Sequence, residues 1–180
     1  QSMKKTSGIT KIIEANDFEQ YLRHLAKKHT VVYTPYTKAM RYDFVHNPAQ
    51  KELHAQLERI FTTVVDCTQD ISRLRAVKTS EEIEAIKKAV RVTRHAFESV
   101  RAQLETYQHE YEIEADITRI FRRANAIHAY DPIIASGPNA VTLHYTKNNA
   151  KVGKKQLLLI DVGARVDGYA ADVTRTYCLR

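Results

Sequence analysis

Hydrophobic residues recur every three or four positions in four stretches of the chain, which is the spacing of one apolar helix face. The first stretch follows Asp17, a potential helix cap, and the second begins near Pro48, a residue that suits a first helical turn. The third follows Thr79 and Glu82, which form a capping-box pattern, and the fourth covers residues 110–126. The pattern therefore predicts four amphipathic helices, of which the last two are long.

Short runs of β-branched and aromatic residues between these helices are typical of strands. Residues 30–34 and 62–65 flank the second helix, so strand, helix and strand indicate a parallel crossover. Further strand candidates follow the last helix, at residues 131–135, 141–146, 157–166 and 169–178. Asp167-Gly168 separates the last two and is a strong signal for a tight hairpin turn.

These elements predict an α/β (α+β) fold with two parts. Residues 1–3 look like the remnant of a purification tag and are left out of the fold prediction. Residues 4–72 form part of a small α/β domain, because two strands are too few to stand alone. Residues 73–180 form a second domain, in which two long helices pack on an antiparallel sheet.

Composition narrows the possible partners and compartments. The net charge is +7, but the basic residues are scattered among acidic ones, which favours a solvated surface over a nucleic-acid interface. Cys67 and Cys178 lie far apart without a CxxC motif, so we expect a reducing, cytoplasmic compartment. No apolar run approaches the ~20 residues of a membrane span, so we expect no membrane partner.

The hairpin around Asp167-Gly168 brings two aspartates together. A two-residue turn pairs Val166 with Tyr169, and the same register places Gly163 opposite Asp172. Side chains alternate between the faces of a strand, so Asp161 and Asp172 share one face as diagonal neighbours, roughly 7–8 Å apart. Gly163 is expected to leave empty volume beside Asp172.

The opposite face of the hairpin is apolar and predicts a core, with Leu158, Ile160, Val162, Ala164, Ala171 and Val173. Two carboxylates on the other face of such a ribbon repel each other unless a cation or a proton neutralises them. Oxygen ligands of this kind suit Mn, Mg or Ca. A metal site and the polar side of an edge hairpin both remain open at this point, although aspartate is uncommon in strands.

His144 lies in a predicted strand between Leu143 and Tyr145. A single histidine in a strand is more often structural than catalytic. The other seven histidines show no spacing that suits metal ligands. Residues alone therefore leave the role of His144 open.

Five segments together resemble one known family. DVG at 161–163 and GYAADVTRT at 168–176 resemble the first metal-binding hairpin of the pita-bread metallopeptidases. IASGPN at 134–139, LHYT at 143–146 and the lead-in at 75–83 are most similar to bacterial aminopeptidase P. Residues 4–72 resemble part of the creatinase-type N-terminal domain. The resemblance implies that residues 73–180 are the first half of a pita-bread catalytic domain.

The resemblance also implies a chemistry. Family members hydrolyse the peptide bond before a proline in second position, through a water activated by two divalent ions, of which Mn is the most common. Asp161 would bind one ion and Asp172 would bridge both. His144 would contact the substrate and stabilise the developing oxyanion, and Tyr169 would also contact the substrate.

The family's histidine ligand and its two glutamate ligands follow this part of the sequence. We therefore expect the chain to be a fragment of an Xaa-Pro aminopeptidase-like protein, truncated within the catalytic domain and at the N-terminus. Alone, it should bind metal weakly or not at all and lack appreciable peptidase activity. An exposed sheet edge should favour a homo-oligomer. The alternative is a non-catalytic binding module of the same fold, against which intact Asp161, Asp172 and His144 count.

Overall fold

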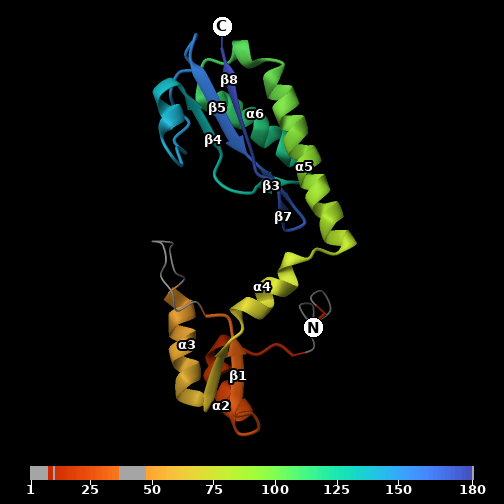
Figure 1. Ribbon diagram of the computed structural model, residues 1–180, viewed down its shortest axis with the longest axis vertical. Helices are drawn as coiled ribbons and strands as arrows, with labels where there is room; N and C mark the ends of the chain where they lie inside the picture. The colour runs from red at the N-terminus through yellow and green to blue at the C-terminus, as the bar shows by residue number, and fades with distance from the viewer. Residues whose placement is uncertain (1–7, 10, 37–47, 180) are drawn as a thin grey trace. The chain divides into compact units, whose positions relative to one another are not determined.

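The computed structural model describes residues 8–9, 11–36 and 48–179 of the chain (Figure 1). The chain divides into two compact units, residues 1–77 and 78–180, so the division falls a few residues beyond the predicted boundary after residue 72. The predicted tag remnant, residues 1–3, lies outside the described residues. No helix in the described ranges is long and apolar enough to cross a membrane.

The first unit contains the predicted parallel crossover. The short 3-10 turn η1 (Ala15–Asp17) leads into α2 (Phe18–Ala26), and β1 (Val31–Thr34), α3 (Pro48–Ile60) and β2 (Thr63–Asp66) follow. Strands β1 and β2 pair in parallel. A small core of Leu22, Leu57 and Phe61 joins the two helices to this pair. Asp17 is the N-cap residue of α2, as predicted, but its side chain makes no capping hydrogen bond.

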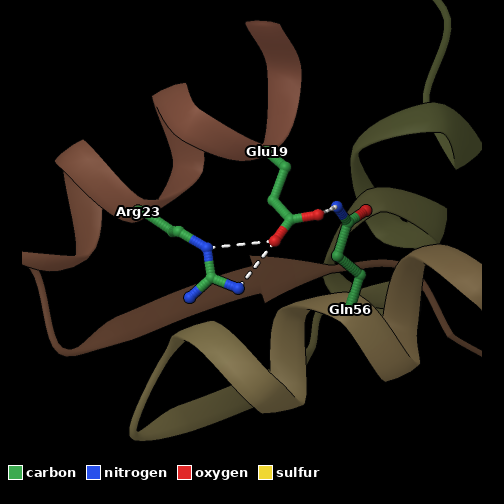
Figure 2. Close-up of polar contacts among 3 residues, drawn as sticks. All are labelled: Glu19, Arg23 and Gln56. Carbon is green, nitrogen blue, oxygen red and sulfur yellow. Dashed lines mark hydrogen bonds and ion pairs between the residues drawn. The ribbon is translucent and has the colours of Figure 1, made fainter. Parts of the chain in front are cut away.

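A polar contact on the surface links α2 to α3 (Figure 2). Glu19 accepts hydrogen bonds from Arg23 Nη2 at 2.6 Å and from Gln56 Nε2 at 3.3 Å. The hydrogen bond from Arg23 is the main reason why the pKa of Glu19 is lowered. The Glu19–Arg23 pair lies within α2 and is solvent-exposed, so it contributes little to stability.

The segment after β2 is a helix that is not among the four predicted ones. Helix α4 covers Thr68–Ala76. Asp66 accepts hydrogen bonds from the backbone N–H of Thr68 at 2.9 Å and from its hydroxyl at 2.5 Å, which anchors the first turn. A local side-chain hydrogen bond of this kind favours the start of a helix.

Two long helices and two small sheets make up the second unit. Helix α5 (Ser80–Arg101) begins with the predicted capping box of Thr79 and Glu82. The 3-10 turn η2 (Leu104–Thr106) leads into α6 (Glu110–Arg123). In Figure 1, α6 lies behind strands β4 (Ile133–Ser136), β5 (Leu157–Val162) and β8 (Val173–Cys178). Fully buried side chains of α6 and β5 form the core: Ile113, Ile117, Phe121, Leu158, Ile160 and Val162.

The predicted hairpin has the expected register but is shared between two sheets. Val166 pairs with Tyr169, and Asp161 pairs with Thr174. The single strand predicted at 157–166 is divided into β5 and β6 (Ala164–Val166), and the returning strand into β7 (Tyr169–Ala170) and β8. Strands β4-β5-β8 form one antiparallel sheet, and β6 and β7 form another with β3 (Ile127–His128), a strand that was not predicted.

Gly163 lies at the point where the hairpin changes sheets. A Cβ atom at this position would lie 1.8 Å from the carbonyl oxygen of Ala171. The prediction of empty volume beside Asp172 is therefore wrong, since the space is filled by backbone of the opposing strand. Thr93 of α5, which is fully buried, accepts a hydrogen bond at 2.9 Å from the N–H of Ala164 and so fixes the bend to the helix layer.

The strand predicted at 141–146 is also wrong. Residues 137–141 form the 3-10 turn η3 (Gly137–Val141), and the following residues form an irregular loop. His144 has a positive φ of 52°, a conformation that does not fit a strand. No strand pairs with this segment among the described residues, and buried side chains of other elements hold it instead.

Replacing Gly163 by alanine tests the bend directly. We expect Gly163→Ala to lower the free energy of unfolding by about 1–3 kcal/mol or more, because the obstructing atom is a backbone oxygen that cannot rotate away. Asp167→Asn is the matched control in the same hairpin: Asp167 already has a φ of 51°, and its side chain is exposed. Asparagine tolerates that conformation, so the control should change stability little. Urea unfolding of both variants measures the difference. Equal stability of the two variants would contradict the close approach between position 163 and the carbonyl oxygen of Ala171.

Candidate metal-binding site

Asp161 and Asp172 converge on one tyrosine hydroxyl. Asp161 lies in β5, while Asp172 lies in the break between β7 and β8. The hydroxyl of Tyr130 is 2.5 Å from Asp161 Oδ1 and 2.9 Å from Asp172 Oδ1. The structure therefore brings together the two predicted ligands and adds a third residue, Tyr130, that sequence reasoning missed.

Nothing in the sequence pointed to Tyr130. It precedes β4 in an ordinary polar connection, and only the folded sheet brings it to the aspartates. Burial is the main cause that raises the pKa of its hydroxyl, and its hydrogen bonds to Asp161 and Asp172 raise it further. Tyr130 thus remains a neutral donor. Its single proton can serve only one carboxylate at a time, so the two acidic groups are not fully compensated.

His144 lines the same cleft as the two aspartates. The cleft has a volume of about 420 Å³, and its walls also include Tyr130, Asp131, Ile133 and Thr146. His144 is exposed on the loop that follows η3. The predicted catalytic histidine and both predicted metal ligands therefore share one open cleft, although they come from a loop, from β5 and from the break between β7 and β8.

Tyr169, the other predicted substrate contact, does not line this cleft. Its hydroxyl donates a hydrogen bond of 2.6 Å to Glu82 in the first turn of α5. This hydrogen bond is the main cause that lowers the pKa of Glu82. The position of Tyr169 gives its substrate role no support, and the contact instead ties the hairpin turn to α5.

The donor set suits a hard divalent cation only in part. Two carboxylates that face one hydroxyl supply oxygen ligands, which Mn²⁺ and Mg²⁺ accept. Within the described ranges, however, no group of three or more His, Cys, Asp or Glu side chains is placed to hold a metal ion. The described residues thus fit one side of a metal centre.

A family model covers most of the second unit. The model of metallopeptidase family M24 matches residues 84–180, which is more than half of the chain. The chain belongs to metallopeptidase family M24. Asp161, Asp172 and His144 all lie within the M24 match.

Relatives and solved structures of the M24 family extend the likeness to the first unit. Xaa-Pro aminopeptidase of Escherichia coli (strain K12) is 29% identical over 174 residues, which is 94% of this chain and 40% of the relative. Xaa-Pro aminopeptidase of Haemophilus influenzae is 37% identical over 120 residues, 65% of this chain and 27% of the relative.

Two solved structures have the same fold. Aminopeptidase P from E. coli in its low-pH form superposes with a TM-score of 0.78 at 27% identity, covering 97% of this chain and 41% of that one. Proline aminopeptidase P II from Yersinia pestis gives a TM-score of 0.77 at 26% identity, with 97% and 41% coverage. The α/β architecture is thus that of the pita-bread M24 enzymes, and the chain spans about 40% of their length.

The two neighbouring carboxylates, Asp161 and Asp172, give a stability prediction. Replacing Asp172 by asparagine in metal-free protein should raise the free energy of unfolding by on the order of 1 kcal/mol, because it removes like-charge repulsion between two carboxylates that share one hydroxyl donor. Asp167→Asn, in the exposed turn and close to Lys88, is the control and should not stabilise the protein. Urea unfolding in the presence of a chelator measures both. A loss of stability in Asp172→Asn would contradict the proposed repulsion.

Proposed function

We propose that the second unit carries the aspartate side of the dinuclear centre of an Xaa-Pro aminopeptidase. The observation that carries the proposal is the convergence of Asp161 and Asp172 on Tyr130, in one cleft with His144. Membership of the M24 family and the named aminopeptidase relatives support the reaction class, which is hydrolysis of the bond before a proline in second position.

Four residues of the cleft have a role in this proposal. Asp161 and Asp172 would hold the divalent ions, with Tyr130 orienting both carboxylates. The ions, when bound, would supply Lewis-acid activation of the peptide carbonyl and of the attacking water. His144 reaches into the cleft from its loop and donates a hydrogen bond to the substrate carbonyl as negative charge develops on it.

We further propose that the metal is manganese and that the protein is cytoplasmic. Carboxylate oxygens are among the ligands that Mn²⁺ prefers. Cys67 and Cys178 are both free thiols, which is consistent with a reducing compartment.

Metal binding tests the role of the aspartate pair. We expect Mn²⁺ to bind the 180-residue chain weakly, because two carboxylates make an incomplete ligand set. Asp161→Asn and Asp172→Asn should each remove this binding, while Asp70→Asn, on exposed α4, should leave it unchanged. Isothermal titration calorimetry or the electron paramagnetic resonance signal of free Mn²⁺ gives the affinities. Equal binding in Asp172→Asn and wild type would overturn the assignment.

Peptidase activity tests the completeness of the site. We expect no appreciable turnover of an Xaa-Pro peptide by these 180 residues with Mn²⁺, since a hydrolase of this kind needs both ions fixed in place. The measurement is release of the N-terminal residue, with and without a chelator. Turnover that is abolished by the chelator and by Asp172→Asn would show that the chain assembles a complete site.

We also propose that the chain self-associates through β8. This strand lies at the edge of its sheet, and Thr174, Arg175 and Thr176 are exposed on it. A cleft of about 320 Å³ runs between β8 and α5, with Phe97 and Tyr177 among its walls. Edge-to-edge pairing of two β8 strands would satisfy the open backbone groups and close a symmetric dimer.

Sedimentation velocity at increasing concentration measures this association. We expect a dimer or larger oligomer for the wild type, weakened by Thr176→Lys, because a charged lysine on an edge opposes strand pairing. A monomer at all concentrations would contradict the proposal.

A further inference from the structure

The loop that carries His144 connects β4 to β5 and covers residues 137–156. Apart from η3 and an isolated antiparallel bridge between Lys151 and His109, no regular structure fixes its shape among the described residues. A connection of this length within a compact unit usually has a function. The backbone bridge holds only the C-terminal end of the loop, so the position of His144 depends on side-chain hydrogen bonds.

Glu110, the first residue of α6, is the main anchor. Its side chain is completely buried. Oε1 accepts hydrogen bonds from the N–H of Ser136 at 2.8 Å and from Asn139 Nδ2 at 3.2 Å. Oε2 accepts from the Tyr145 hydroxyl at 2.8 Å and from the N–H of Ala150 at 2.9 Å. Every partner is a donor, and the four donors flank His144 on both sides in the sequence.

Capping of α6 does not require Glu110. Glu112 performs that task, because it accepts hydrogen bonds from the backbone N–H groups of Gln108 at 2.6 Å and His109 at 3.3 Å. All side-chain contacts of Glu110 described above lead away from α6 to the end of β4 and to the loop. A buried carboxylate is costly unless donors compensate it fully, and a fully compensated one fixes geometry more narrowly than apolar packing does.

A second buried side chain, Asn148, holds the same loop against β4. Its Oδ1 accepts a hydrogen bond from the N–H of Ile134 at 2.9 Å, and its Nδ2 donates to Glu114 at 2.8 Å and to the carbonyl of Pro132 at 2.9 Å. Asn148 thus adds a second tether on the C-terminal side of His144, where Glu110 also holds Tyr145 and Ala150.

We propose that Glu110 is a positioning residue: its buried carboxylate fixes the loop of residues 139–150 and so holds His144 at the Asp161–Asp172 pair. The proposal rests on the proposed function for the role of His144, but the anchoring itself does not. Tyr145 transmits the restraint to its neighbour His144. Burial raises the pKa of the Tyr145 hydroxyl and the hydrogen bond to Glu110 raises it further, so this contact persists as a donor interaction.

The test compares Glu110→Gln with the matched control Glu112→Gln. Both remove one negative charge from the first turn of α6, but only Glu110 contacts the loop. A glutamine at position 110 has one acceptor oxygen, so two of the four donors lose their partner. Hydrogen exchange of the wild type and both variants, checked for folding by circular dichroism, measures the anchoring.

In Glu110→Gln we expect the amides of Ser136 and Ala150 to exchange at least about 10-fold faster, while core amides of β5 stay protected. Glu112→Gln should match the wild type at Ser136 and Ala150. Unchanged exchange at these two amides in Glu110→Gln would overturn the proposal.

Mn²⁺ titration followed by proton NMR then tests the position of His144. Line broadening by Mn²⁺ falls steeply with distance, so the ring signals of Tyr130 report the metal at the aspartate pair and those of His144 report the loop. In Glu110→Gln we expect the broadening of His144 relative to Tyr130 to fall at least about 2-fold, whereas Glu112→Gln keeps the wild-type ratio. An unchanged ratio in Glu110→Gln would overturn the positioning role.

Failure of the metal proposal has a different signature. If Mn²⁺ leaves Tyr130 unbroadened in the wild type, the proposed function fails and hydrogen exchange alone decides whether Glu110 anchors the loop. If Glu110→Gln does not fold, Tyr145→Phe replaces it, since it removes one donor from the loop itself. We then expect faster exchange at His144 and its neighbours, and unchanged exchange there would overturn the proposal.

Discussion

The close approach of the Ala171 carbonyl to Gly163 is the constraint on which the candidate site depends. It occurs where one hairpin passes from one small sheet to the other. Because of this break, Asp172 lies outside the regular ladder while Asp161 remains in β5. The two carboxylates can therefore turn towards the same hydroxyl of Tyr130. Any side chain larger than hydrogen at position 163 would separate the strands where they must converge.

Buried polar groups hold the backbone on both sides of this break. In the described part of the second unit, the buried polar and charged residues are Thr93, Glu110, Ser136 and Asn148. Thr93 binds the N–H of Ala164 beside the break, and Ser136 accepts a hydrogen bond from Gly153 at 3.0 Å. Glu110 and Asn148 hold the His144 loop. The polar groups that this unit buries thus all support the cleft or its loop, whereas apolar packing supports the remainder.

Local patterns were sufficient to predict α2, α3, α5, α6 and the hairpin register, but not α4. The Asp167-Gly168 turn fixes which residues face each other, and alternation then puts Asp161 and Asp172 on one side. The capping box at Thr79 is equally local. The family resemblance, carried by short segments of the second unit, is confirmed by the M24 match.

Features that depend on distant contacts were missed. The run at 141–146 has the alternation of a strand, but no described strand pairs with it, and the buried Glu110 holds the Tyr145 hydroxyl instead. The division of the hairpin at Gly163 follows from an approach between residues of two strands, which no propensity encodes. Tyr130 belongs to no motif, and it joins the site only because β4 pairs with β5.

The most direct test of this account is the location of manganese in a crystal of the 180-residue chain. Crystals soaked in Mn²⁺ should give an anomalous scattering peak within coordination distance, about 2.0–2.6 Å, of carboxylate oxygens of both Asp161 and Asp172. His144 should face the same cleft. An anomalous peak bound elsewhere, or none at this pair at saturating Mn²⁺, would contradict the assignment of the hairpin as one side of a metal centre.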